Sequence, residues 1–131
     1  MASIFSRIIS GELPSYKVYE DDYFFAFFDI RPMVMGHTLV IPKKEVDYIF
    51  DLESEEYIGL MLVAQKVAKA LKKVVPCTRI GVAVVGLEVP HTHVHLMPIN
   101  TVSDMNFKNP VVQLTPEKFK SLAEDISTAI E

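Results

Sequence analysis

Three of the four histidines in this chain lie within five residues, as His91, His93 and His95. Side chains alternate between the two faces of a β-strand, so a strand here would direct all three imidazoles to one side, spaced by about 6.6 Å along the chain. Imidazole titrates near neutral pH and can act as a nucleophile, an acid, a base or a metal ligand. The row therefore predicts a site in which several imidazoles act together.

Three interpretations of this row compete. In the first, one histidine attacks a substrate while its neighbours orient it and supply protons. In the second, two histidines in His-x-His spacing hold a metal ion. In the third, the histidines lie on a solvated face and have no task. We favour catalysis, because Cys77 is the only cysteine and the nearest carboxylate, Glu88, is a weak candidate for a specific ligand.

Apolar patterns and turn residues predict the elements that hold the row in place. We expect strands at residues 17–20, 23–28, 37–41, 79–85 and 91–98, and helices at residues 3–9, 54–75 and from residue 115 onward. Neighbouring strands without crossover helices pair antiparallel most readily. The order predicts an α+β domain, an antiparallel sheet of about five strands with a long helix and a C-terminal helix on one face. The strand at 79–85 has few polar residues and is expected to be central.

The helices carry their own positional predictions. Ser54 is the expected N-cap of the long helix, and Pro116 is expected in the first turn of the last one. Apolar spacing predicts the buried faces. For the long helix these residues are Tyr57, Met61, Ala64, Ala68, Leu71 and Val75, and for the last helix they are Phe119, Leu122, Ala123, Ile126 and Ile130.

The composition fits one ordinary globular domain over residues 1–131, with 50% hydrophobic and 23% charged residues. The formal net charge of -4 argues against a protein that coats nucleic acid. A single cysteine forms no internal disulfide and favours a reducing compartment. The sequence has no signal peptide and no run of the roughly 20 apolar residues that crosses a bilayer. We therefore expect a soluble, cytoplasmic protein with no membrane partner.

The histidine row, residues 91–97 (HTHVHLM), resembles the signature of the histidine triad (HIT) family. Residues 3–14 (SIFSRIISGELP) are similar to the opening helix of that family. Residues 25–32 (FAFFDIRP) and 36–43 (GHTLVIPK) are similar to its second block. The resemblance covers most of the chain. It implies a HIT-like fold and hydrolysis or transfer at the α-phosphate of nucleoside phosphate conjugates.

The resemblance also implies roles for single residues. His93 would be the nucleophile and would form a nucleotidyl-histidine intermediate that water then cleaves. His95 would contact the phosphate and the leaving group, and His91 would hold the geometry of the site. His37 matches an additional active-site histidine of the family, and Asp29 matches the residue that binds the ribose hydroxyls.

A group of apolar residues would surround the base of the purine nucleotide, an AMP-like moiety. By resemblance these residues are Ile4, Phe5, Ile8, Phe27 and Ile30. Burial habits alone equally predict Ile8, Phe27 and Ile30 to be plain core, and Asp29 to be a turn residue. The family also implies a homodimer in which the sheet continues across the two-fold axis, with the long helix near the interface. The resemblance leaves the leaving group of the substrate open among amines, nucleotides and acyl groups.

Two departures from the family pattern qualify this picture. Ser3, Ser6 and Glu45 stand where many bacterial members carry the two cysteines and the histidine that bind zinc, so we predict no structural zinc and no cofactor. Leu87 stands where members often have glutamine, and Glu88 follows it. These changes remove polar phosphate contacts. They make a nucleotide- or protein-binding module with little turnover the rival of the enzyme.

Overall fold

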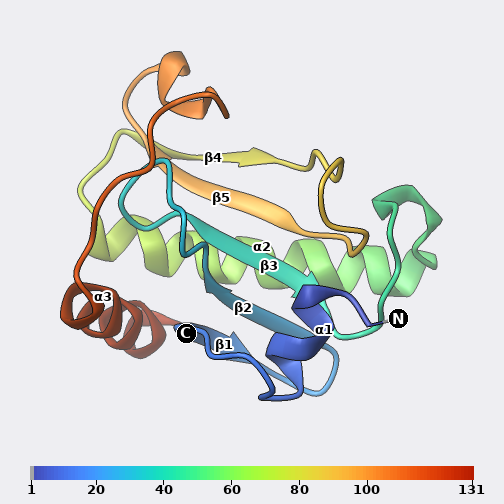
Figure 1. Cartoon of the computed structure of the whole chain (residues 1–131). Coiled ribbons are helices and arrows are strands. Elements are labelled where there is room, and N and C mark those ends of the chain that lie inside the picture. The colour runs from blue at the N-terminus through green and yellow to red at the C-terminus, as the bar shows by residue number, and fades with distance from the viewer. Residues whose placement is uncertain (1) are drawn as a thin grey trace.

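A five-stranded antiparallel sheet forms the centre of the computed structural model, which describes residues 2–131 (Figure 1). The strand order is β1-β2-β3-β5-β4, and every neighbouring pair runs antiparallel. The predicted α+β class with about five strands is therefore confirmed. The strands are β1 (Lys17–Glu20), β2 (Phe24–Phe28), β3 (Thr38–Pro42), β4 (Arg79–Ala83) and β5 (Val94–Ile99).

The two long helices cover one face of the sheet and a short helix lies on the other (Figure 1). The prediction that the long helix and the C-terminal helix share one face is therefore confirmed, and the N-terminal helix covers the other face. Within residues 2–131, none of the helices is both long and apolar enough to cross a membrane. The helices are α1 (Ile4–Ile9), α2 (Ser54–Val74) and α3 (Pro116–Ala129), with short 3-10 turns η1 (Ile49–Asp51) and η2 (Val102–Met105).

Alternation along β2 divides the core into two layers. Ala26 and Phe28 pack with residues of α2 and α3. Phe25 and Phe27 face the opposite side and pack with Phe5 of α1. Because apolar side chains line both faces of β2, the sheet needs cover on both sides. This requirement explains why α1 packs on the face of the sheet opposite α2 and α3.

The predicted buried face of α2 is confirmed at Ala64, Leu71 and Val75, but the face as a whole is rotated from the predicted one. Its fully buried side chains are Leu60, Val63, Ala64, Val67, Ala70 and Leu71. Tyr57 is 37% exposed because its ring lies near Phe50 in an exposed aromatic group, so it does not belong to the core. The N-cap is Glu53 rather than Ser54, since the Glu53 carbonyl accepts the first helical hydrogen bond from Tyr57 N–H.

The last helix follows the sequence prediction closely. Thr115 is its N-cap and accepts a hydrogen bond from Lys118 N–H, while Pro116 occupies the first turn. A proline fits there because its missing N–H would have no helical partner. The predicted stripe is confirmed at its buried positions, Phe119, Leu122, Ala123 and Ile126.

The strand predicted to be central, β4, is an edge strand that pairs with β5 alone. It also ends at Ala83 instead of Val85. Val82 is 53% exposed and Val85 is 50% exposed. After α2, the chain enters the sheet on the outer side of β5, so β4 becomes the edge strand. The apolar residues of β4 therefore form an exposed apolar edge and not a buried central strand.

The turn before β3 requires a glycine. Gly36 has a φ of +87°, a conformation that side chains with a Cβ rarely adopt. A Cβ at this position would also lie 3.1 Å from side-chain atoms of Leu71 and Val75. The glycine therefore lets the loop close onto α2 and deliver His37 at the start of β3.

Candidate active site

The histidine row lies where the chain enters β5. The strand begins at Val94 and not at His91 as predicted, because Thr92 N–H donates to the Val46 carbonyl (2.7 Å) instead of to a neighbouring strand. Alternation still holds along the row. Val94 packs in the layer of α2 and α3, while the rings of His91 and His93 lie 5.8 and 5.0 Å from the ring of Phe5 on the opposite face.

His93 has one ring nitrogen fixed and one left for chemistry. Its Nδ1 lies 2.7 Å from the backbone carbonyl of His91. A carbonyl oxygen only accepts, so Nδ1 carries the proton and Nε2 keeps its lone pair. The ring is 7% exposed and lies 4.9 Å from the ring of His95. A neutral imidazole held in this tautomer is equipped to attack an electrophile from Nε2.

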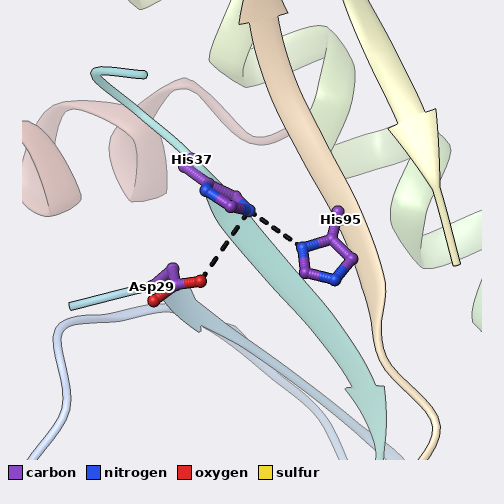
Figure 2. Close-up of side chains that lie close together, drawn as sticks. All are labelled: Asp29, His37 and His95. Carbon is purple, nitrogen blue, oxygen red and sulfur yellow. Dashed lines mark hydrogen bonds and ion pairs between the residues drawn. The ribbon is translucent and has the colours of Figure 1, made fainter. Parts of the chain in front are cut away.

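His95 and His37 form a buried pair that reaches toward Asp29, as Figure 2 shows. Met33 N–H donates to His37 Nδ1 (3.3 Å), so the neutral His37 ring carries its proton on Nε2. That nitrogen lies 2.9 Å from His95 Nδ1 and 3.9 Å from Asp29 Oδ2. His95 Nδ1 therefore accepts, and the neutral His95 ring carries its own proton on Nε2.

Burial keeps this pair neutral. Loss of solvent, together with the smaller effects of its neighbours His37 and His93, lowers the pKa of His95 to about 3. Desolvation also lowers the pKa of His37, although the carboxylate of Asp29 opposes that shift. Both rings are thus uncharged at neutral pH. They offer a directed N–H donor rather than a positive charge.

His91 is held at both ring nitrogens. Its Nε2 donates to the carbonyl of Pro42 (2.7 Å), and its Nδ1 accepts from the hydroxyl of Ser3 (2.7 Å). The side chain is fully buried, and that burial lowers the pKa of His91 despite the opposing effects of Pro42 and Glu45. With both nitrogens occupied, His91 joins α1, β3 and β5 and is fitted to hold the site in shape.

Ser3, Ser6 and Glu45 form a small polar cluster around His91. Glu45 accepts from the backbone N–H of Ser3 (2.6 Å) and from the hydroxyl of Ser6 (2.7 Å). These hydrogen bonds lower the pKa of Glu45 to about 2. Ser3 is also the N-cap of α1, because its hydroxyl accepts from Ser6 N–H. The cluster anchors α1 to the histidine row.

The donors in this cluster do not fit a structural zinc ion. Zinc prefers thiolate, imidazole and carboxylate ligands, and serine hydroxyls replace thiolates poorly. The Nδ1 of His91 is already engaged by Ser3, and one oxygen of Glu45 accepts both hydrogen bonds from α1. Hydrogen bonds among these side chains therefore join the segments that a metal ion would otherwise bridge.

The sequence pattern also allows a metal ion held by the histidines of the row themselves. His91 and His93 do not converge on a common ion, because three of their four ring nitrogens are hydrogen-bonded elsewhere. Asp29, His37 and His95 do bring ligand atoms within 4.8 Å of one another. A cation there would have to displace the proton shared by the two imidazoles, so the hydrogen-bonded pair is the arrangement that this geometry favours.

The residues expected around a base are only partly brought together. Phe5 and Phe27 are buried, with ring centroids 5.5 Å apart, and Ile8 packs against the same cluster. Ile4 and Ile30 are instead 48% and 68% exposed. The ring of Phe5 packs against the rings of His91 and His93, which ties this residue directly to the site.

The geometry of Asp29 is compatible with both interpretations given to it. Its Oδ1 accepts from the backbone N–H of Arg31 (2.9 Å), which makes it a turn residue. Its Oδ2 faces His37, and the side chain is 26% exposed. A carboxylate has further lone pairs in this position, so it remains able to accept hydroxyl groups.

Sequence reasoning missed several groups that shape the site. The carbonyl of Pro42 and the N–H of Met33 set ring tautomers, but backbone groups leave no signal in residue types. Ser3, Ser6 and Glu45 were singled out only as replaced zinc ligands, so the hydrogen bonds that join them were not predicted. Phe107, whose ring lies 5.0 Å from that of His95, was not singled out either, although an aromatic residue in a polar loop was a visible signal.

The comparisons with known proteins agree with the geometry. Residues 10–102 match the profile of the HIT domain. An uncharacterized HIT-like protein of Borreliella burgdorferi is 39% identical, with 97% of each chain covered. An adenosine 5'-monophosphoramidase of Schizosaccharomyces pombe is 31% identical over 100% of both chains. The crystal structure of a Hit-like protein involved in cell-cycle regulation from Bartonella henselae aligns with a TM-score of 0.84 at 34% identity, covering 98% of this chain and 96% of that chain.

These likenesses extend over the sheet, the helices and the histidine row together. They confirm the family resemblance that the histidine row and the two blocks before it in the sequence indicated. The chain belongs to the HIT domain family, whose members include adenosine 5'-monophosphoramidases.

Proposed function

We propose that this protein cleaves a purine nucleotide conjugate at its α-phosphorus through a nucleotidyl intermediate on His93. The observation that carries the proposal is the hydrogen bond from His93 Nδ1 to the His91 carbonyl, which leaves the Nε2 lone pair free. Adenosine 5'-monophosphoramidases among the relatives support a substrate with an AMP moiety. Covalent catalysis of this kind divides one difficult displacement into two easier ones.

In the first step, His93 Nε2 bonds to phosphorus while the bond to the leaving group breaks. Nε2–H of His95 donates a hydrogen bond to the leaving atom, and the proton with which the leaving group departs comes from solvent water. In the second step, water attacks the phosphorus, the bond to His93 breaks, and the proton released by water passes to solvent. His37 supports both steps, because its N–H holds His95 in the tautomer that presents a donor on Nε2.

The nucleoside would lie on the side of the row formed by α1 and β2. Phe5 offers an apolar surface beside His93, and Asp29 offers carboxylate oxygens for ribose hydroxyls. The ring of Phe27 packs against that of Phe5, with the two ring centroids 5.5 Å apart. Apolar contacts of this kind discriminate weakly between bases, so placed hydrogen bonds would have to supply any strict preference for adenine.

The test is hydrolysis of an adenosine phosphoramidate beside a diadenosine polyphosphate, with the wild type and His93→Ala. We expect turnover by the wild type and its loss in His93→Ala, and the preferred substrate identifies the leaving-group class. A wild type that binds AMP but turns over neither substrate would contradict the proposal. It would then favour the binding module, for which the exposed Leu87 and Glu88 before the row are the notable departures.

We further propose that the protein is a cytoplasmic homodimer joined through β4. Val82, Val84 and Val85 are 53%, 38% and 50% exposed along this edge, where the backbone of the strand pairs on one side alone. An apolar edge strand invites pairing with another strand. A second copy would extend the sheet antiparallel across a two-fold axis, with the nearby exposed face of α2 contributing.

A further inference from the structure

Phe107 is the second aromatic residue in contact with the histidine row. Its ring centroid lies 5.0 Å from that of His95, with the two planes at 79°. The side chain is 43% exposed, so it is neither core nor free surface. Phe5 contacts His93 from α1, whereas Phe107 contacts His95 from the segment between β5 and α3, coloured orange in Figure 1.

The turn that carries Phe107 is built by its own hydrogen bonds. Asn109 N–H donates to the Asn106 carbonyl (2.9 Å), which closes a turn with Phe107 and Lys108 at its centre. The Asn106 side chain accepts from Lys108 N–H (2.9 Å), and the Asn109 side chain donates to the Ser103 carbonyl (2.8 Å). A turn closed in this way holds its central side chain in place before any ligand arrives.

Both ends of the segment are also attached to the fold. Met105 lies over β4, so closely that a Cβ at Gly81 would fall 2.7 Å from its sulfur. Val112 N–H donates to the carbonyl of Pro32 (2.7 Å), which lies in the same loop as Asp29. The segment therefore spans from the sheet edge to the Asp29 loop and passes His95 on the way.

The tautomer of His95 shows which group would meet Phe107. Nδ1 of His95 is occupied by His37, so the N–H that remains available to donate is on Nε2, at the other side of the ring. Any leaving atom that accepts a hydrogen bond from this N–H must lie against the same imidazole that Phe107 contacts. A substituent on that atom would therefore share the surroundings of one imidazole with Phe107, whose ring centroid lies 5.0 Å from that of His95.

We propose that Phe107 forms one wall of a leaving-group subsite and selects conjugates whose departing amine carries an apolar or aromatic substituent. This inference rests on the proposed function of the His93 site. An aromatic wall stabilises an apolar substituent by removing it from water. It gives nothing to ammonia, which is too small to reach it, and it disfavours a polyphosphate, whose charges must stay solvated.

The experiment compares N-substituted adenosine phosphoramidates with the wild type and Phe107→Ala. The substrates are the unsubstituted compound, an n-butyl derivative, a 2-phenylethyl derivative and a diadenosine polyphosphate. We expect Phe107→Ala to lower kcat/KM about tenfold for the 2-phenylethyl derivative, mainly through KM, and less than about twofold for the unsubstituted compound. Phe107→Leu should restore most of the preference, because it keeps an apolar wall.

Val102→Ala is the matched control, since Val102 is 90% exposed in the same segment, and it should leave all four rates unchanged. An equal loss of rate for every substrate in Phe107→Ala would overturn the proposal, because it would show that Phe107 holds His95 in place and does not select among leaving groups. An unchanged preference would overturn it as well.

A binding measurement separates this proposal from the proposed function. Calorimetry with the same phosphoramidates gives Kd values even for an inactive protein. A wild type without turnover contradicts the His93 mechanism, while a tighter Kd for the 2-phenylethyl compound that is lost in Phe107→Ala still supports the subsite. Equal Kd values for substituted and unsubstituted compounds in the wild type contradict the subsite alone.

Discussion

Backbone groups set the proton positions of all four histidines. The carbonyls of His91 and Pro42 force a proton onto His93 Nδ1 and His91 Nε2, respectively. Met33 N–H does the reverse for His37 and thereby decides the tautomer of His95. His91 and His37 have partners at both nitrogens, whereas His93 and His95 each keep Nε2 free, and the roles of nucleophile and hydrogen-bond donor follow from these two nitrogens.

The first prediction concerns these tautomers. Nitrogen-detected NMR of the histidine rings should show His93 protonated on Nδ1, and His37, His91 and His95 protonated on Nε2, at neutral pH. His95 should stay neutral down to about pH 5, because burial lowers its pKa to about 3. A His95 ring that gains its second proton near 6.5 would contradict this account of the pair.

At the scale of elements, α1 is the part whose attachment is least expected. It is six residues long, too short to be stable alone, and lies on the sheet face opposite the long helices. Its attachment combines the apolar contact of Phe5 with the polar cluster of Ser3, Ser6 and Glu45. Displacing α1 would therefore disturb His91 and the Phe5 surface beside His93 together.

Ser3→Ala should lower the free energy of unfolding by about 1–3 kcal/mol. The substitution removes the N-cap of α1 and leaves the buried Nδ1 of His91 without its donor. Urea denaturation measures the change. Ser121→Ala, at an exposed position of α3, is the matched control and should have little effect. Equal behaviour of the two variants would show that the cluster does not hold α1.

The elements could be predicted from sequence to different extents. β1, β2, β3 and α3 follow from residue patterns because local propensity and burial agree there. β4 does not, since a continuous apolar run is the same for a central strand and for an exposed apolar edge. The candidate site shows the same division. Alternation predicts that the histidines share a face, whereas the Ser3–Glu45 contact depends on segments brought together by the fold.

At the scale of the whole molecule, the apolar edge of β4 and the buried histidines govern assembly and stability. The sheet has two edges, and β1 forms the other one. The exposed valines gather at and beyond the β4 edge. An exposed apolar edge strand promotes aggregation in a monomer, whereas in a dimer it can pair with the same strand of a second copy.

Val84→Asp should therefore convert a dimer into a monomer, because it places a charge in an apolar strand-to-strand contact. Analytical ultracentrifugation measures the mass directly. Tyr23→Lys is the control, as Tyr23 is 74% exposed next to β2 and lies away from β4. A monomeric wild type, or a dimer that survives Val84→Asp, would contradict pairing through this edge.

Stability should also fall as the pH is lowered from neutral to about 5. The pKa values of His37, His91 and His95 are lowered from 6.5, mainly by burial. Below 6.5 the unfolded chain therefore binds more protons than the folded one, and each such histidine costs about 1.4 kcal/mol per pH unit. Urea denaturation across this interval measures the slope, and a flat profile would contradict the buried neutral state.

The central claim is that Nε2 of His93 becomes bonded to the nucleotide. Wild-type protein should be mixed with an adenosine phosphoramidate, quenched within the first turnover and digested for tandem mass spectrometry. The account predicts an adenylyl group on His93 that disappears as AMP accumulates. Turnover without any adduct on His93, or an adduct on another residue, would contradict it.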